Sequence, residues 1–434
     1  MKVNVYDLAT LPAAERARIM RRSETDITDL RAVVEPIIAE VKQRGDAALL
    51  EFSAKFDGVK LDPAALRVTE AEFAVAEARL DPKVREAIEL SVANVRRYHE
   101  AQLPEAMWMK EIVPGVLAGE KVTPISSVGL YVPRGKGSFP SVMMMLGVPA
   151  SLARVPRVIV CTPPTPEGTV DDATLVAARL CGLDEIYKVG GAQAIAACAY
   201  GTATIPRVHK VLGPGNKYVS AAKRMLYGTI DVGTPAGPSE SIVLCDEHAD
   251  PDLAAHDLLI EAEHGPDSAA LLVTHSARLI EQVVARVPGL VARLPAERKK
   301  YCEAVMAGFG GIVKTGSLAE SFAFVNEYAP EHLEVLVENP FEALAQITNA
   351  GEVLLGPHTP ITLGNFSIGV NAILPTGGFA HTFSCVSMFD FLKRTSFAYA
   401  SRDGFDRLSP IAQTLAHFEG FPSHAAALAF RDGR

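Results

Sequence analysis

Apolar residues recur three or four positions apart between residues 13 and 110, as Val33, Ile37, Ile38 and Val41 do. This period places them on one face of a helix, and the same region is rich in alanine, leucine, glutamate and arginine, which favour helices. Residues 52–66 interrupt the pattern, because they contain Asp-Gly at 57–58 and Asp-Pro at 62–63, two pairs typical of turns. The first hundred or so residues are therefore predicted to be mainly helical.

The pattern changes near residue 123, where short runs rich in β-branched residues begin to alternate with alanine-rich stretches of helical period. Strands are predicted at 124–133, 158–161, 185–189, 208–212, 241–245, 269–274, 333–337 and 352–355. Helices are predicted at 172–181, 192–199, 216–226, 251–264, 277–286, 318–327 and 340–349. The tail after residue 383 is less regular and ends in a predicted helix. This alternation predicts an α/β fold with mostly parallel sheets covered by helices.

Composition narrows the class of protein. A chain of 434 residues suits two or three domains, and 48% hydrophobic with 21% charged residues allows a large core. The net charge of −9, with no basic run, argues against a nucleic-acid partner. No apolar run suggests a signal peptide or a membrane span, so a cytoplasmic location is expected. The six cysteines are scattered without a CxxC pair and are expected to be reduced core residues.

Several segments carry side chains that can bind a metal. Asp-Pro at 250–251 is a typical helix start and Gly-Pro at 265–266 a typical stop, so Glu261 and His264 are expected on one face of the last helical turn. A carboxylate and an imidazole so placed can bind zinc, although such a pair is more often a solvated helix face. The loop at 356–365 supplies Asn365 at the carboxyl end of a strand, where α/β sheets usually build their sites. Residues 419–424 supply a further carboxylate and imidazole. Spacing alone does not bring these segments together.

An acid–base pair and three glycine clusters complete the candidate chemistry. Glu331 and His332 lie between a predicted helix and strand, and an imidazole beside a carboxylate suits general-base catalysis; the alternative is a cap and a packed ring. The glycine clusters lie at 190–191, 213–215 and 237, and the first two follow a strand and open a helix. Exposed backbone N–H groups there can approach a phosphate, but no GxGxxG fingerprint is present and simple turns remain an alternative.

Eight segments together resemble the histidinol dehydrogenase family, in the family's order and across residues 125–430. They are Gly-Leu-Tyr-Val-Pro at 129–133, Val-Gly-Gly-Ala-Gln-Ala-Ile-Ala at 189–196, Gly-Pro-Gly-Asn-Lys-Tyr-Val at 213–219, Ala-Gly-Pro-Ser-Glu at 236–240, Ala-Glu-His at 262–264, Ala-Pro-Glu-His-Leu-Glu at 329–334, Asp-Phe-Leu-Lys-Arg-Thr-Ser at 390–396 and Glu-Gly-Phe-Pro-Ser-His-Ala at 419–425. The helical N-terminal part is compatible with the family but less distinctive.

The resemblance implies two Rossmann-like parallel-sheet domains, a helical N-terminal region and a C-terminal dimerisation tail. The first domain would be discontinuous, comprising 1–130 and 240–385, the nucleotide-binding domain would be 131–239, and the tail 386–434 would cross to the partner in a homodimer. The implied reaction is a two-step, NAD-dependent oxidation of a small primary alcohol to a carboxylate through an aldehyde, with one Zn²⁺ per subunit.

The resemblance also assigns roles to individual residues. The cofactor contacts fall on Tyr131, Gln193 and Asn216, the catalytic pair on Glu331 and His332, and further substrate contacts on Ser239 and Glu419. The zinc ligands fall on Glu261, His264, Asn365 and His424. In the family, the residues equivalent to Glu419 and His424 reach the partner subunit's site, so a composite active site is expected.

This chain departs from the family pattern at the metal site and in the pocket. Glu261 stands where the family has glutamine, and Asn365 where it has aspartate, so the exchange keeps the ligand charge constant. Ala372 replaces a histidine that helps to form the histidinol pocket, which weakens recognition of that substrate. Arg134 stands where glycine is usual and, with His381, is a candidate for binding an anionic group; the alternative for each is a solvated surface residue.

These departures resemble the sulfopropanediol dehydrogenase branch, which oxidises (2R)-2,3-dihydroxypropane-1-sulfonate to 3-sulfolactate. We therefore expect an enzyme of sulfonate catabolism. Three alternatives remain open: a histidinol dehydrogenase that tolerates the substitutions, a dehydrogenase of another small polyol or amino alcohol, and a zinc- and nucleotide-binding protein without activity.

Overall fold

The computed structural model describes residues 1–22, 27–134 and 137–432. The chain forms two compact units. The first comprises residues 1–102 and 126–391, and the second comprises 103–125 and 392–434. Among the described helices, none is long and apolar enough to cross a membrane.

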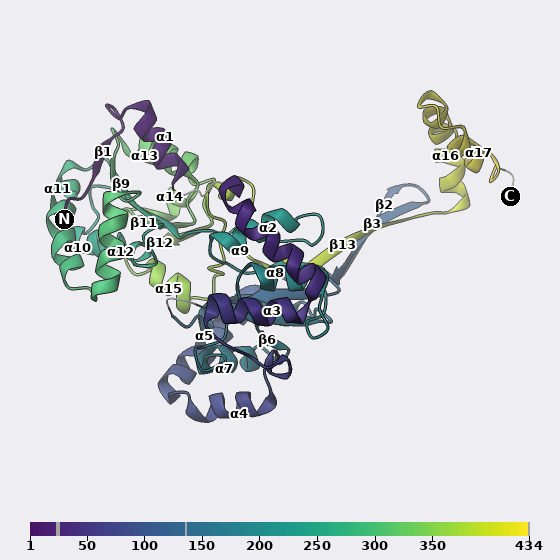
Figure 1. Cartoon of the computed structure of the whole chain (residues 1–434). Coiled ribbons are helices and arrows are strands. Elements are labelled where there is room, and N and C mark those ends of the chain that lie inside the picture. Colours follow the sequence, from purple (N-terminus) through teal and green to yellow (C-terminus); the bar gives the residue numbers. More distant parts are fainter. Residues whose placement is uncertain (23–26, 135–136, 433–434) are drawn as a thin grey trace. The chain divides into compact units, whose positions relative to one another are not determined.

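The larger sheet of the first unit has six strands, all parallel. In sheet order they are β1 (Val5–Asp7), β10 (Gly311–Lys314), β9 (Ala269–Thr274), β8 (Glu240–Cys245), β11 (His332–Leu336) and β12 (Glu352–Leu355). Apolar side chains of one face pack on α10 (Pro251–Asp257), α11 (Ala277–Ala292) and α12 (Ala296–Ala307). Those of the other face pack on α1 (Ala13–Arg21), α13 (Leu318–Tyr328) and α14 (Pro340–Leu344) (Figure 1). The sheet is thus buried on both faces, as its nearly continuous apolar strands predict.

The smaller sheet of this unit has four parallel strands. Their order is β6 (Ile186–Lys188), β5 (Val158–Thr162), β4 (Val128–Tyr131) and β7 (Lys210–Leu212). One apolar cluster joins the sheet to α2 (Ile27–Arg44), α3 (Asp46–Phe52), α8 (Gly191–Tyr200) and α9 (Lys217–Leu226). Further helices pack on one another, namely α4 (Glu70–Arg79), α5 (Pro82–Glu100), α6 (Pro140–Leu152) and α7 (Asp172–Leu180). Because the chain order reverses between β4 and β7, a crevice for a ligand is expected at their carboxyl ends.

Short helical segments complete the first unit. They are η1 (Ser53–Asp57), η2 (Pro63–Ala65), η3 (Glu261–Glu263), α15 (Ile361–Phe366), η4 (Phe379–His381) and η5 (Met388–Asp390).

The second unit is an antiparallel three-stranded sheet with two helices. Its strands are β2 (Met107–Val113), β3 (Val116–Pro124) and β13 (Leu392–Ala400), with β3 in the centre. Helix α16 (Arg402–Phe418) packs against α17 (Pro422–Ala429). Large apolar side chains are exposed on β2 and α16, among them Trp108, Ile411 and Phe418.

The structure confirms the predicted α/β class with parallel sheets and also corrects several elements. The predicted helix 251–264 ends at Asp257, and 340–349 ends at Leu344. The irregular tail contains the nine-residue strand β13, and the end of the predicted helical region is strand β2. Both strands form by pairing with β3: β2 pairs with it as its neighbour along the chain, and β13 pairs with it from far away in the sequence, which local periodicity does not reveal. The division into domains 1–130 with 240–385, 131–239 and 386–434 stays a prediction.

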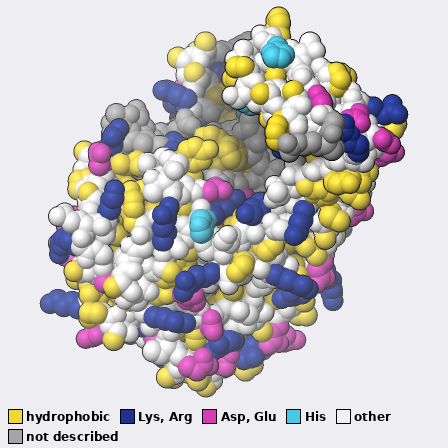
Figure 2. Space-filling view, turned by 90° about the vertical axis from the view of Figure 1, so that its right-hand side faces the viewer, with side chains coloured by type: hydrophobic (Ala, Val, Ile, Leu, Met, Phe, Trp, Pro, Cys, Tyr) yellow, Lys and Arg dark blue, Asp and Glu magenta, His cyan; other side chains and the backbone are white. Residues whose placement is uncertain are grey.

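All six cysteines carry free thiols, and five of them are buried, as the sequence predicts. On the face drawn in Figure 2, acidic and basic side chains are interspersed.

Candidate active site

A cluster of acids and imidazoles lies at the amino-terminal edge of the six-stranded sheet. Ser239 immediately precedes β8, and His332 and Glu352 are the first residues of β11 and β12. In the parallel register His332 lies beside Glu352 on one side and Ser241 on the other. The expectation that the site would form at the carboxyl ends of these strands was therefore wrong. The residues after β12 instead run back toward the amino edge, since Gly364 of α15 lies against the carboxylate of Glu352.

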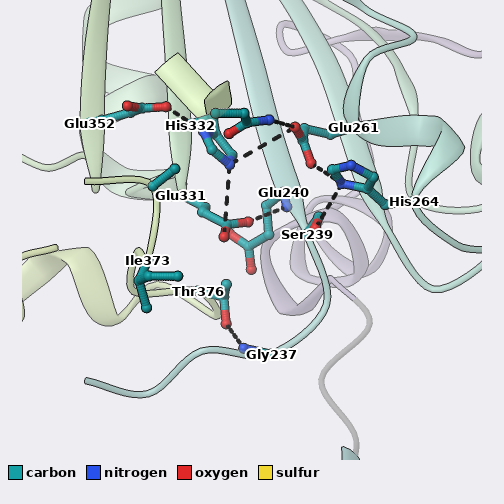
Figure 3. Close-up of polar contacts among 12 residues, drawn as sticks. Gly237, Ser239, Glu240, Glu261, His264, Glu331, His332, Glu352, Ile373 and Thr376 are labelled. Atoms are coloured by element: carbon teal, nitrogen blue, oxygen red, sulfur yellow. Dashed lines mark hydrogen bonds and ion pairs between the residues drawn. The ribbon is translucent and has the colours of Figure 1, made fainter. Parts of the chain in front are cut away.

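His332 is the centre of this cluster and is 3% exposed. Its Nδ1 lies 2.5 Å from Oε1 of Glu352, and its Nε2 lies 3.8 Å from Oε1 of Glu331 and 4.0 Å from Oε1 of Glu261 (Figure 3). Burial lowers the pKa of this imidazole, but the carboxylates of Glu261, Glu331 and Glu352 outweigh it and raise the pKa to about 10. In the protein without metal, these carboxylates therefore favour the doubly protonated, positively charged imidazole of His332 at neutral pH.

Three of the predicted metal ligands lie in contact. Glu261 forms an ion pair with Nδ1 of His264 (Figure 3), and its Oε1 accepts a hydrogen bond of 3.1 Å from Nδ2 of Asn365. Glu261 and His264 lie in and just after η3 rather than in the last turn of an α-helix, but residues three apart also share a face there. Oγ of Ser239 lies 3.1 Å from Nδ1 of His264, so this predicted substrate residue also belongs to the cluster.

The fully buried carboxylate of Glu261 remains ionised. Burial raises its pKa, but His264 and His332 outweigh this effect and hold the pKa at about 2. Burial likewise lowers the pKa of His264, and the Glu261 carboxylate raises it above its ordinary value. A buried anion requires a compensating cation, and here protons on the two imidazoles supply the positive charge.

The donor set around Glu261 fits zinc. A carboxylate, an imidazole and a side-chain amide are all groups that bind this metal. Within the described ranges no group of three or more His, Cys, Asp or Glu residues is arranged to hold a metal, and the fourth predicted ligand, His424, belongs to the second unit. His424 lies on α17 and Glu419 at the end of α16, and both are exposed. Glu261, His264 and Asn365 would thus supply three of the four predicted zinc ligands, and the fourth would have to come from outside the first unit.

Glu331 lies beside Glu240, which sequence reasoning did not single out. Oε2 of Glu331 accepts a hydrogen bond of 2.8 Å from the backbone N–H of Glu240. Burial raises the pKa of Glu331 well above its usual range, and the positive charge of His332 partly opposes this rise. Arg22, stacked on Tyr328, places its Nε 3.4 Å from Oε2 of Glu240 and keeps that buried carboxylate paired. Arg22 lies far from the motifs in sequence, and no local signal marks it.

The three predicted cofactor residues lie at the carboxyl edge of the four-stranded sheet. Tyr131 ends β4, and its hydroxyl accepts a hydrogen bond of 3.0 Å from the N–H of Gly191, at the start of α8. Gln193 is buried in the first turn of that helix, and Asn216 caps α9 after β7. Gly213 has φ +121°, and a Cβ there would lie 2.0 Å from the backbone oxygen of Tyr131. The strand ends therefore approach one another at the topological switch, where a dinucleotide is expected.

A pocket lies beside α9 and Glu240. It is lined by residues of α9, by the loop 232–238, by Glu240 and by the segment 376–379. Four of its lining residues are cationic, namely Arg22, Lys217, Lys223 and Arg224. This charge suits an anionic group of a ligand.

Two predicted anion-binding residues make other contacts. Arg134 donates to the backbone oxygen of Pro164, 3.3 Å away. Burial raises the pKa of Asp57, and the charge of Arg134 partly offsets this rise. The hydrogen bond to Thr165 is the main cause that lowers the pKa of Glu167, and Arg134 adds to it. His381 is exposed, and its Nε2 lies 3.1 Å from the backbone oxygen of Glu327. Neither contact involves the cluster around His332, and the roles of both residues stay predictions.

Glu352, like Glu240 and Arg22, is a residue near the site that sequence reasoning missed. Its identity as the first residue of a predicted strand gives no sign of function, and only the register of β11 and β12 brings it to His332.

Comparison with known proteins identifies the family of this chain. The family model described as histidinol dehydrogenase matches residues 20–432. A "histidinol dehydrogenase homolog" of Cereibacter sphaeroides is 54% identical, covering 99% of this chain and 98% of that protein. A "histidinol dehydrogenase" of Synechocystis is 52% identical over 99% of each chain. The crystal structure of histidinol dehydrogenase from Elizabethkingia anophelis superposes with a TM-score of 0.93 at 33% identity, covering 99% of this chain and 98% of that one. The chain therefore belongs to the histidinol dehydrogenase family and is an NAD-dependent oxidoreductase that acts on CH–OH groups.

Proposed function

We propose that this enzyme oxidises (2R)-2,3-dihydroxypropane-1-sulfonate to 3-sulfolactate, and that zinc and NAD serve the reaction as they do in the family. The family's reaction is a two-step oxidation of an alcohol, and only the substrate is in question. The observation that carries the proposal is the contact between Glu261 and Asn365. Position 261 carries a carboxylate where the family has an amide, position 365 carries an amide where the family has a carboxylate, and the two side chains are in contact. This pairing favours a rearranged metal site over the loss of the site.

The surroundings of the site support a substrate other than histidinol. Ala372 offers only a methyl group where the family's histidine meets that substrate, and its backbone N–H is turned to Sδ of Met145, 3.1 Å away. A small diol could offer the metal two adjacent oxygens in place of an imidazole nitrogen. The cationic pocket beside Glu240 suits a sulfonate, and it equally suits the phosphates of a dinucleotide.

The chain's own residues would bind zinc and move the protons. Glu261, His264 and Asn365 would hold zinc, with His424 of a second copy as fourth ligand. When bound, zinc orients and polarises the substrate hydroxyl, and NAD accepts the hydride. Nε2 of His332 takes the proton of the alcohol in the first step. Glu331 takes a proton from the water that adds to the aldehyde, and His332 takes the hydroxyl proton of the hydrate in the second step. Each alcohol thus gives one carboxylate and two NADH, with one water consumed.

A homodimer would complete the site. The exposed apolar side chains of β2 and α16, such as Trp108, Ile411 and Phe418, support burial of the second unit against another copy. Glu419 and His424 of that copy would then contribute a substrate contact and the fourth ligand.

The test is NADH formation by the zinc-loaded enzyme with dihydroxypropanesulfonate and with histidinol, side by side. We expect two NADH per molecule of the sulfonate and at most slow turnover of histidinol. Rapid turnover of histidinol would leave the enzyme class standing but overturn the proposed substrate, in favour of the activity named for the Synechocystis relative.

A variant tests the base. His332→Ala should abolish NADH formation with zinc content unchanged, whereas His256→Ala should leave both unchanged because its imidazole is exposed and its ring nitrogen pairs with the backbone oxygen of Asp252. Undiminished turnover by His332→Ala would refute the assignment.

A further inference from the structure

We propose that Glu352 is a positioning residue for His332: it fixes which imidazole nitrogen faces the substrate and stabilises the positive ring that forms when the proton is taken. The inference rests on the proposed role of His332 as base. Its evidence is the geometry of the pair and the isolation of the carboxylate.

The backbone dictates the contact. His332 and Glu352 are register partners on neighbouring parallel strands, so their side chains leave the same edge of the sheet on the same face. Oε1 of Glu352 lies 2.5 Å from Nδ1 of His332, and the two side chains are only 6% and 4% exposed. A charged hydrogen bond this short, shielded from water, holds a ring far more firmly than a surface ion pair does.

The contact decides where the reactive nitrogen points. A carboxylate only accepts hydrogen bonds, so it keeps a proton on Nδ1. The opposite nitrogen, Nε2, faces Glu331 and Glu261 at 3.8 and 4.0 Å (Figure 3). The lone pair of Nε2 is then available on the side where the proposed ligands of the metal lie, which is the tautomer that the base requires.

Apart from the contact with His332, no hydrogen bond of the Glu352 carboxylate is seen in the described part of the chain. Of its two buried oxygens, Oε2 has no hydrogen-bond partner in the described part of the chain. A Cβ at Gly364 would lie 3.2 Å from both oxygens, so the backbone of α15 closes over the group without donating to it. A buried carboxylate with one oxygen unpaired destabilises the fold, and its hydrogen bond to His332 is what the site gains from it.

Glu352→Gln separates positioning from mere packing, because glutamine has the same shape. Its amide can donate to Nδ1 and so move the proton to Nε2, and it carries no charge. We expect kcat to fall by about 10- to 100-fold, the range seen when a partner of a functional histidine is removed, while zinc content and the KM values for NAD and the alcohol stay within about twofold. Glu352→Asp, which keeps the charge, should recover part of the loss. Glu338→Gln, at an exposed position just after β11, the strand of His332, is the matched control and should behave as wild type.

A second readout does not depend on the substrate. In zinc-loaded enzyme labelled with ¹⁵N-histidine, we expect a far-downfield proton attached to Nδ1 of His332, assigned by its absence in His332→Ala. It should also be lost or shifted upfield in Glu352→Gln. An unchanged spectrum, or kcat within twofold of wild type in Glu352→Gln, would overturn the proposal. If neither alcohol is oxidised by the wild type, the proposed function fails, and the spectrum still decides the pairing.

Discussion

Restoring the family's residues at positions 261 and 365 tests whether the substitutions at these two positions compensate for each other. Asn365→Asp replaces the amide that donates to Glu261 with a second carboxylate at the same place. The donor and acceptor are 3.1 Å apart, so the substitution loses a hydrogen bond and sets two negative charges side by side.

The size of the effect follows from this distance. Two unit charges about 3 Å apart repel by about 5 kcal/mol at an effective dielectric constant of about 20. The new aspartate can escape by binding a proton, which at pH 7 costs about 4 kcal/mol from an ordinary pKa of about 3.9. Asn365 is partly exposed, so solvent screening reduces the penalty further, to about 2–3 kcal/mol.

Glu261→Gln alone should also destabilise the metal-free protein, since it removes the buried counter-ion of His264 and one of the three carboxylates around His332. The double variant restores one carboxylate and one amide. We expect it to recover about 2 kcal/mol relative to the sum of the single variants.

The assay is thermal unfolding of the four metal-free proteins, with zinc content measured after reloading. We expect Asn365→Asp to lower the midpoint by several degrees and the double variant to regain most of it. Strict additivity of the two substitutions would refute the view that the positions compensate for each other.

Three further predictions concern parts of the first unit away from the metal ligands. Burial, together with the neighbouring Asp257, raises the pKa of Glu334 to about 9. The folded chain therefore keeps a proton that the unfolded chain releases above about pH 4.5, so the free energy of unfolding is highest below that pH and falls as the pH rises toward 9. Urea unfolding at pH values from 5 to 9 should show a smaller fall of this free energy with pH in Glu334→Gln than in the wild type. Tyr131→Phe removes the acceptor for the N–H of Gly191 and should raise the KM for NAD about fivefold with zinc content unchanged, since a lost hydrogen bond is worth about 1 kcal/mol; an unchanged KM would contradict the cofactor assignment. Gly213→Ala should destabilise the unit by more than about 3 kcal/mol, because its Cβ would meet a backbone oxygen at 2.0 Å, and a normal melting temperature would contradict this packing.

Much of the fold could be predicted from the sequence because its signals are local. The buried strands of both sheets are short β-branched runs between alanine-rich helices, and period alone identifies them. The antiparallel strands β2 and β13 were missed because most of their side chains are exposed and their stability comes from β3, a partner distant from β13 in the sequence.

The candidate site was predictable only in part. The pairs Glu261–His264 and Glu331–His332 are visible in short stretches of sequence, because their members lie at most three residues apart. The resemblance to a family assigned Asn365 to the same metal site as Glu261 and His264. Glu352, Glu240 and Arg22 reach the site through strand register and long-range pairing, which no window of sequence contains. The edge of the sheet was predicted wrongly for the same reason: the strand run 352–355 is visible, but the return of α15 to the opposite edge is a tertiary feature.

Anomalous diffraction at the zinc absorption edge, on crystals of metal-replete protein, tests the central claim most directly. We predict one zinc ion per subunit, bound by the Glu261 carboxylate and the His264 imidazole, with Asn365 in its coordination sphere and His424 of a second copy completing it. A structure with full occupancy of zinc elsewhere, or with none near Glu261 and His264, would contradict it.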